Sequence, residues 1–341
     1  MVTQRDVAQR AGVSVRTVSN VINDFAWVAD ETRARVQAAV DELGYRPNLL
    51  ARGLQRGRSG LIALVLPLDV QYFHDLASAV VDEAERRGFT VLIERTAGNP
   101  ARERDLVTRP ERASLFDAII FSPLTLDDTE LRHQPGDTPV VLLGEKPTGR
   151  GFDRVIMDDA AAAEAVTRHL LEQGRTRIAA IGQPARPAGR TAQHRTRGYR
   201  RALAAAGIDF DPALVGGIRS FQRADGAAAM ARLLDAGPPP DAVFGYNDLL
   251  ALGALRTLLS RGIRVPDDIA VAGFDDIEDG RYSTPTLTTI APDLPRLAGH
   301  TLDLVQRRLD GYDGRPTTRR TGWTLIARES TGVAKAPQLE H

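Results

Sequence analysis

One face of a predicted helix near the amino terminus carries side chains of the types that read DNA bases. The segment Val15–Asn23 has apolar residues at helical spacing, which turns one face of it inward. The face that remains outside carries Val15, Arg16, Ser19 and Asn20. Arginine pairs bidentately with guanine, and asparagine pairs in the same way with adenine. The spacing therefore favours a helix that presents Arg16 and Asn20 to base edges. The alternative is an ordinary helical hairpin in a small bundle.

A second set of polar and aromatic residues follows predicted strands later in the chain. The set comprises Tyr72, Phe73, Arg195, Phe221, Asn247 and Asp275. A guanidinium, a carboxylate, an amide and aromatic faces suit a polyhydroxylated small ligand. Taken singly, each has a simpler explanation: the neighbouring Asp248 could be only a helix cap, and Phe274 only a core residue. Their joint occurrence at strand ends favours a ligand-binding site.

Residue types for catalysis or metal binding do not occur in a useful pattern. The chain has no cysteine, its six histidines lack metal-ligand spacing, and it has neither a phosphate-binding glycine loop nor a G-x-S-x-G elbow. The pair Asp275-Asp276 follows a strand, where carboxylates more often orient a ligand hydroxyl than act as an acid and a base. We therefore expect no catalytic residue, no metal, no cofactor and no enzymatic activity.

Three predicted helices position the base-reading side chains. They span Gln4–Ala11, Val15–Asn23 and Glu31–Leu43. Gly12 can adopt the positive φ of a tight corner, and Ser14 and Asp30 are suitable caps for the second and third helices. A helix, a turn with glycine and a second helix form the geometry that places the second helix in the major groove.

Charge is uneven along a chain of 341 residues with no net charge. Residues 1–60 hold nine arginines and six acids, a net of +3. Residues 46–58 contain four arginines and no acid, which favours contact with phosphates over a merely solvated linker. Asn48 could cap a short helix that ends near Arg56, but a helix of this length is unstable alone.

The remaining sequence alternates short apolar runs with helical patterns. Strands are expected at 61–66, 90–93, 118–121, 140–143, 154–157, 177–181, 242–245 and 270–273, and helices at 74–87, 159–173, 194–206, 223–236 and 248–261. Continuous apolar strands separated by helices predict parallel sheets covered on both faces. The fold class is therefore a small helical head followed by a two-lobed α/β body of doubly wound sheets. Ligands of such sheets bind beyond the carboxyl ends of the strands.

The amino-terminal segment closely resembles the DNA-binding head of the LacI/GalR family of bacterial transcription regulators. The matching residues are Asp6-Val7-Ala8, Ala11-Gly12-Val13-Ser14, Thr17-Val18-Ser19, Val21-Ile22-Asn23, Thr32-Arg33, Val36, Gly44-Tyr45, Pro47-Asn48, Ala51-Arg52 and Leu54. A second close match runs from Arg264 to Ile269 and from Thr284 to Thr289. The resemblance implies a repressor with a periplasmic-binding-protein-like body that binds a pseudo-palindromic DNA operator and a small effector, a sugar or nucleoside-like molecule.

The resemblance also implies roles for single residues. Val15, Arg16 and Asn20 would contact bases, whereas the DNA backbone would be held by Thr3, Ser14, Thr17, Ser19 and Asn23. Leu54 would be a wedge in the minor groove, or it could simply pack against the body. Positions matching Arg195, Asn247 and Asp275 contact effector in the family, and Arg190 and Phe73 fall near other contact positions.

These patterns divide the chain into a helix-turn-helix domain (1–46), a hinge helix and linker (47–58), an effector-binding and dimerisation domain (59–330) and a tail (331–341). Lobe 1 is expected at about 59–158 and 292–320, and lobe 2 at about 161–290 and 322–330, with crossings near 158–161, 290–292 and 320–322. The tail ends in Leu339-Glu340-His341, typical of a cloning scar, and lacks the leucine-heptad helix of tetrameric members, so a homodimer is expected. Without a signal peptide or an apolar run of about 18 residues, a cytoplasmic protein with no membrane contact is expected.

The sequence departs from the family pattern at Met157-Asp158, at Gly174-Arg175 and between Glu94 and Phe121. The first departure removes a polar group near the expected cleft, which indicates a ligand less sugar-like than usual. Two other functions remain open. One is a solute-binding protein with the same body fold, and the other is an enzyme on a Rossmann-like body.

Overall fold

The computed structural model describes residues 2–22, 25, 27–45, 58–108, 115–126, 130–131, 137–144, 151–184 and 190–332. The chain forms two compact units, Met1–Gly60 and Leu61–His341. They are called here the head and the body.

In the described part of the head, three helices form a bundle, α1 (Gln4–Ala11), α2 (Val15–Ile22) and α3 (Asp30–Leu43). Gly12 ends α1 with φ 65°, the left-handed conformation that glycine adopts without strain. The buried side chains that join the helices are Val7, Ala8, Val18, Val21, Val36 and Ala39. The third helix differs from the prediction, since Asp30 is its first residue and not its cap. The N-cap is Ala29, which supplies no side-chain hydrogen bond.

Lobe 1 of the body is built on a six-stranded parallel sheet of order β11-β5-β4-β3-β1-β2. Its strands are β1 (Leu61–Leu66), β2 (Thr90–Arg95), β3 (Ala118–Phe121), β4 (Val140–Leu143), β5 (Asp153–Met157) and β11 (Thr318–Thr321). The helices described in this lobe are α5 (Gln71–Arg86), α6 (Pro100–Thr108) and α14 (Leu294–Leu309). In β1, Ile62 and Leu64 pack toward α5 and α14, and Ala63 and Val65 pack on the opposite face. Burial on both faces explains the continuous apolar sequence of this strand.

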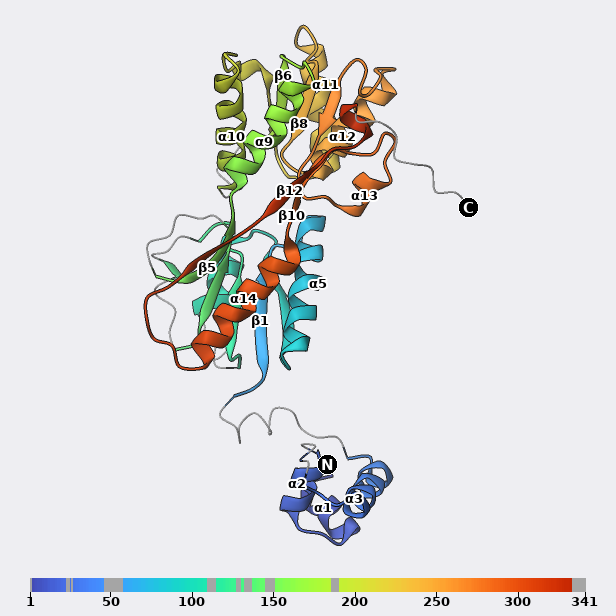
Figure 1. Ribbon diagram of the computed structural model, residues 1–341, viewed down its shortest axis with the longest axis vertical. Helices are drawn as coiled ribbons and strands as arrows, with labels where there is room; N and C mark the ends of the chain where they lie inside the picture. Colours follow the sequence, from blue (N-terminus) through green and yellow to red (C-terminus); the bar gives the residue numbers. More distant parts are fainter. Residues whose placement is uncertain are drawn as a thin grey trace. The chain divides into compact units, whose positions relative to one another are not determined.

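Lobe 2 is built on a four-stranded parallel sheet of order β7-β6-β8-β9. Its strands are β6 (Ile178–Pro184), β7 (Val215–Ile218), β8 (Ala242–Gly245) and β9 (Ala270–Ala272), and its helices are α9 (Asp159–Glu172), α10 (Thr191–Ala205), α11 (Arg223–Asp235), α12 (Asp248–Ser260) and α13 (Glu278–Arg281), with 3-10 turns η1 (Pro212–Leu214) and η2 (Glu329–Thr331). Helices α9 and α10 pack together, as do α11 and α12 (Figure 1). Both pairs depend on a glycine, because a Cβ at Gly198 would overlap the Ala160 carbonyl and one at Gly253 the Arg223 carbonyl.

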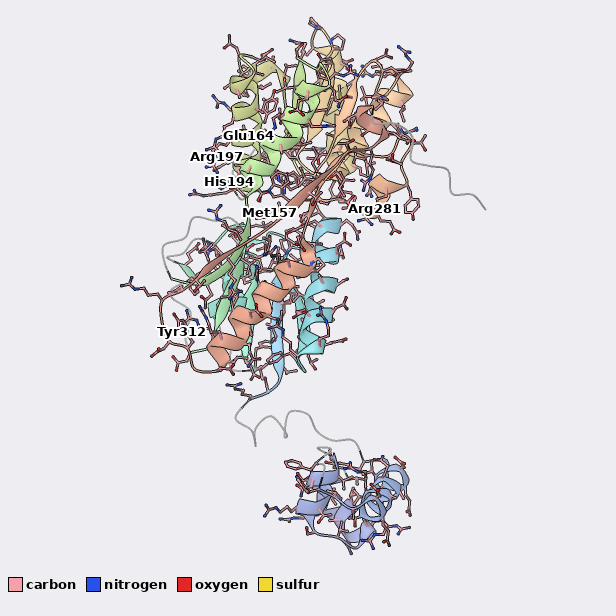
Figure 2. All side chains as sticks on the ribbon, viewed as in Figure 1. Met157, Glu164, His194, Arg197, Arg281 and Tyr312 are labelled. Carbon is pink, nitrogen blue, oxygen red and sulfur yellow. The ribbon has the colours of Figure 1, made fainter. Side chains whose placement is uncertain are left out.

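The chain passes between the lobes at three places. It leaves lobe 1 after β5, returns through β10 (Thr289–Pro292), and leaves again between β11 and β12 (Trp323–Ile326) (Figure 1). Strands β10 and β12 pair antiparallel to each other. Met157, labelled in Figure 2, lies at the first of these passages.

The predicted fold class is confirmed: a helical head precedes a two-lobed body of parallel sheets. Strand β7 and helices α6, α13 and α14 were not predicted. Two helices also begin three residues earlier than expected, α5 at Gln71 and α10 at Thr191. Tyr72 and Phe73 therefore belong to the first turn of a helix, and Arg195 lies one turn inside α10.

Candidate functional site

Helix α2 has one buried face and one face open to solvent. Val18 and Val21 are buried in the head core, whereas Val15 is 40% exposed and Arg16 is exposed. Ser19 and Asn20 are half-buried on the flank. The helix thus presents the predicted base-reading residues outside the bundle, with the most exposed of them at its N-terminal end. Helix-turn-helix proteins contact bases with that end.

The predicted phosphate contacts at the helix starts already have partners within the head. The Ser14 hydroxyl accepts the Thr17 backbone N–H at 3.1 Å, and the two hydroxyls are 2.9 Å apart. Thr3 donates its N–H and its hydroxyl to Asp6 at 2.7 and 2.8 Å, and these bonds lower the pKa of Asp6. Thr3 can donate to a phosphate only if this capping box opens. Asn23, Leu54 and the hinge segment 47–57 lie outside the described residues.

Arg195 is the centre of a buried cluster in lobe 2. Its Nε and Nη2 both lie 2.8 Å from Asp159 Oδ1, and its Nη1 donates to the Tyr246 carbonyl. Its guanidinium stacks on the Phe274 ring, 3.5 Å from the ring centre. Arg195 Nη2 also lies 3.7 Å from Asp275 Oδ1. The positive charge of the Arg195 guanidinium thus lies beside the carboxyl groups of Asp159 and Asp275.

The charges of this cluster also act on a side chain of lobe 1, the hydroxyl of Tyr72. Burial raises the pKa of the Asp275 carboxyl well above its usual range, and the positive charge of Arg195 opposes the shift. Burial likewise raises the pKa of the Tyr72 hydroxyl, and the negative charges of Asp275 and Asp159 add to this effect. Tyr72 belongs to α5 of lobe 1, so the predicted residues Tyr72, Arg195 and Asp275 are brought together where the lobes meet.

Asn247 has a different position from the one expected of a direct ligand contact. It is 3% exposed and caps α12, accepting the Leu250 N–H at 2.9 Å on Oδ1. Its Nδ2 donates to the Phe221 carbonyl at 3.1 Å, so it also holds the loop that carries Phe221. Phe221 itself packs partly against the lobe 2 core.

Asp248 is not the helix cap that the simpler explanation assumed. Its side chain accepts the Ile277 N–H at 2.9 Å and the Thr289 hydroxyl at 2.6 Å. Burial raises its pKa to about 6. Asp248 therefore supports the turn that follows β9 and presents Asp275, which has φ 113°.

Two other predicted residues lie at the edge of the cluster. Phe73 packs edge-on against Tyr72, with ring centres 5.2 Å apart, and both contact the lobe 1 core. Arg190 is exposed at the start of α10 and makes no capping hydrogen bond. Nearby on the same helix, His194 and Arg197 face each other, with 2.9 Å between Nδ1 and Nη2 (Figure 2).

Sequence reasoning missed Asp159 and Gln222. The departure at Met157-Asp158 suggested a lost polar group, but Met157 packs in the lobe 2 core and Asp158 caps α9. Asp159, the next residue, supplies the carboxylate beside Arg195. An acid two positions past the fifth strand was the available signal. Gln222 donates to the Asp69 carbonyl at 2.6 Å and so links the lobes, a contact between residues too distant in sequence to be suspected.

The charged groups and aromatic faces of this cluster suit binding of a polar small molecule. Within the described ranges, no group of acidic or histidine side chains is arranged to hold a metal ion. The same part of the chain contains no helix long and apolar enough to cross a membrane.

Comparisons with known proteins agree with this division of the chain. A family model described as bacterial regulatory proteins, lacI family, matches residues 3–48, and one described as a periplasmic binding protein-like domain matches residues 167–331. The HTH-type transcriptional repressor PurR of Vibrio atlanticus is 31% identical over 316 residues, which cover 92% of this chain and 93% of the relative.

Two solved structures cover nearly the whole chain. The transcriptional regulator CelR in complex with cellobiose is 31% identical, covers 97% of this chain and 100% of its own, and has a TM-score of 0.71. The lac repressor dimer bound to operator and the anti-inducer ONPF is 26% identical, with coverages of 97% and 99% and a TM-score of 0.82. The head matches the lacI family model, and a repressor is 31% identical to this chain over nine-tenths of its length. The chain therefore belongs to the lacI family of bacterial regulatory proteins.

Proposed function

We propose that this chain is a transcriptional repressor that binds a pseudo-palindromic operator as a homodimer and is controlled by a small polar effector held between the lobes. It would act in the cytoplasm and catalyse no reaction. The observation that carries the proposal is the solvent-exposed N-terminal end of α2, where Val15 and Arg16 project from a packed three-helix head. The lac repressor, whose fold this chain shares, was solved as a dimer on its operator.

At the DNA, the exposure of Val15 and Arg16 permits direct contact with bases. Arg16 and Asn20 would read base edges, and Val15 would contact a thymine methyl group. Ser14, Thr17, Ser19 and Asn23 would hold phosphates, and Thr3 would join them once its capping box opens. Leu54 would enter the minor groove from a hinge helix that forms when DNA and a second copy are present.

In the body, the effector would bind at the cluster around Arg195. Asp275 and Arg195 would hydrogen-bond hydroxyl or ring-nitrogen groups, and Tyr72, Phe73 and Phe221 would offer aromatic faces. Arg190 would approach from the start of α10, and Asn247 would act by holding the Phe221 loop. This chemistry suits a sugar or a nucleoside-like molecule, and the cellobiose complex of CelR supports a sugar.

Control would arise because the effector contacts both lobes. Tyr72 belongs to lobe 1, whereas Arg195 and Asp275 belong to lobe 2, so a ligand that joins them favours one relative position of the lobes. The effect on DNA binding can be no larger than the difference in effector affinity between the two lobe arrangements.

A selection experiment tests the proposal. DNA duplexes retained by the purified chain from a random library should share a palindromic sequence, and a scrambled duplex should bind at least tenfold more weakly. A panel of mono- and disaccharides and nucleosides should contain a compound that binds by calorimetry and changes this affinity. Asp275→Asn should lose that response and keep DNA binding, because asparagine tolerates the positive φ of this position. A chain that binds a sugar but selects no duplex would instead be a solute-binding protein.

A further inference from the structure

Three arginines on the outer face of α10 share one surface hollow. Arg197, Arg200 and Arg201 are exposed and stand at positions i, i+3 and i+4, so they lie on one side of the helix. The hollow has a volume of about 540 Å³, and its other lining residues are Gln183, Gln193, Thr196 and Ala204. None of the described residues that line it is acidic. The hollow therefore combines positive charge with neutral hydrogen-bonding groups.

Within the part of the chain that the structure describes, none of these arginines is paired with a carboxylate. Arg197 donates to Nδ1 of His194 at 2.9 Å, and Arg200 and Arg201 form no ion pair. Arg197 and Arg201 are one helical turn apart, a spacing at which like charges destabilise a helix. Other arginines of lobe 2 are paired with acids, as in Arg168–Glu172, Arg177–Asp211 and Arg261–Asp235. A bound anion would reduce the repulsion along α10.

Two acidic residues near this face leave it positively charged. Glu164 belongs to α9, which packs against α10 (Figure 2), and Asp209 follows α10 in the chain. Neither lines the hollow. The remaining acids of α9 and its cap, Asp158, Asp159 and Glu172, are paired with Arg320, Arg195 and Arg168. Even with Glu164 and Asp209 counted, the arginines outnumber the acids at this face.

Two side chains of the hollow are already held in place by their neighbours. The Arg200 guanidinium stacks on the Phe210 ring, 4.4 Å from the ring centre. The Thr196 hydroxyl lies 2.8 Å from the Ala192 carbonyl and 2.7 Å from the Tyr246 hydroxyl. Because these groups are fixed before a ligand arrives, binding would order few additional side chains.

The number and shape of the charged groups indicate the class of ligand. A guanidinium forms paired hydrogen bonds with the oxygens of a phosphate group. One carboxylate would neutralise only one of the three arginines, whereas a phosphate monoester carries about two negative charges at neutral pH. The volume of the hollow falls within the range of small-molecule sites, about 300–1,000 Å³. A small phosphorylated molecule therefore fits this face better than a carboxylic acid.

We infer that the outer face of α10 binds a small phosphate-bearing molecule. Its phosphate oxygens accept hydrogen bonds from Arg197, Arg200 and Arg201, and the amide groups that line the hollow bond its uncharged part. Arg195 lies on the buried side of the same helix, so this site is distinct from the proposed effector site. The inference goes beyond the proposed function and does not depend on operator binding.

Calorimetry with the full-length chain and inorganic pyrophosphate tests the site. The wild type should bind one pyrophosphate per chain. Arg200→Ala and Arg201→Ala should each weaken binding by about tenfold, because each removes charge-assisted hydrogen bonds. Arg256→Ala, which removes an exposed arginine of α12, is the matched control and should keep the wild-type affinity. Absence of binding, or equal binding by Arg201→Ala and the wild type, would overturn the inference.

Further variants separate this site from the other places where the chain could hold an anion. Arg16→Ala in the head and Asp275→Asn in the effector cluster should bind pyrophosphate as the wild type does. Loss of binding in either variant would place the anion elsewhere and reject the inference. Arg201→Lys should bind with an affinity between those of Arg201→Ala and the wild type, because lysine keeps the charge and lacks the fork.

Probes with different uncharged parts distinguish the sources of the phosphate group. ADP presents it on a nucleoside and glucose 6-phosphate on a sugar, and the tighter binder identifies the ligand class. Equal affinities would show that the phosphate group alone is recognised. A polyglutamate peptide that binds more tightly than every phosphate compound, and loses affinity in Arg201→Ala, would assign the face to an acidic protein and contradict the inference. A chain that binds pyrophosphate here but selects no duplex would retain this inference and reject the proposed function.

Discussion

Arg195 and Asp159 form a buried two-point ion pair that joins α10 to the start of α9. Both Nε and Nη2 of the arginine lie 2.8 Å from one carboxylate oxygen, and the two residues are 7% and 8% exposed. A charge pair at such depth is costly to break, because the remaining partner stays charged away from water. The pair therefore both stabilises lobe 2 and sets the position of the guanidinium in the proposed effector site.

Asp159→Asn should lower the free energy of unfolding by about 3 kcal/mol and should also weaken effector binding. Urea unfolding and calorimetry measure the two effects. The matched control is Asp235→Asn, which breaks the exposed pair of Asp235 with Arg261. This control should change stability little, because solvent screens exposed pairs. Equal stability of the two variants would show that the buried pair contributes no more than the exposed one.

Two substitutions of Asn247 distinguish its contribution to stability from its contribution to effector binding. Asn247→Ser keeps an oxygen that can cap α12 but loses the donor to the Phe221 carbonyl, whereas Asn247→Ala loses both. The alanine variant should lose about 1 kcal/mol of stability, and the serine variant much less. Both should bind effector more weakly, because the Phe221 loop is released. Wild-type effector affinity in the serine variant would contradict a positioning role for Asn247.

The raised pKa of Asp248 predicts that the free energy of unfolding falls as pH rises. Its pKa in the folded chain is about 6, above the ordinary value of 3.8, because burial favours the neutral acid. The folded state therefore holds more protons between pH 4 and pH 6. This stabilisation is complete below the unfolded pKa and is lost as pH rises through the folded pKa, and it amounts to about 3 kcal/mol in order of magnitude.

Urea unfolding of the wild type and of Asp248→Asn across this range measures the effect. The variant should be less stable at pH 4, since asparagine keeps one oxygen and places an NH2 group against either the Ile277 N–H or the Thr289 hydroxyl, and its stability should depend less on pH. Parallel pH profiles for the two proteins would show that Asp248 does not titrate in this window.

Arg16→Ala should cost about 1–3 kcal/mol of operator binding and should relax specificity at one base pair. The guanidinium is exposed at the N-terminal end of α2, so its removal should leave the head folded. Competition gel shifts with single-base operator variants measure both effects. Arg35→Ala, which removes an exposed arginine of α3, controls for the loss of one positive charge. An equal loss on scrambled DNA would assign Arg16 to phosphate instead of base contact.

Local patterns in the sequence determined much of this protein. Helical spacing and the turn at Gly12 predicted α1 and α2 and the outward position of Arg16. Continuous apolar runs predicted most of the strands, because a strand buried on both faces cannot tolerate polar residues. Tyr72, Arg195 and Asp275 were recognisable as candidates because the carboxyl ends of parallel strands share one edge of a sheet.

Only the tertiary structure decided which of these side chains meet and what each one does. Asp159 and Arg195 are 36 positions apart in the sequence, and Gln222 reaches Asp69 across 153. The cap of α12 is Asn247 and not Asp248, a choice that depends on the buried Thr289 and Ile277 beside Asp248. Residue spacing reports on the nearest turns of the chain, whereas long-range hydrogen bonds and pKa shifts depend on which groups packing removes from water together.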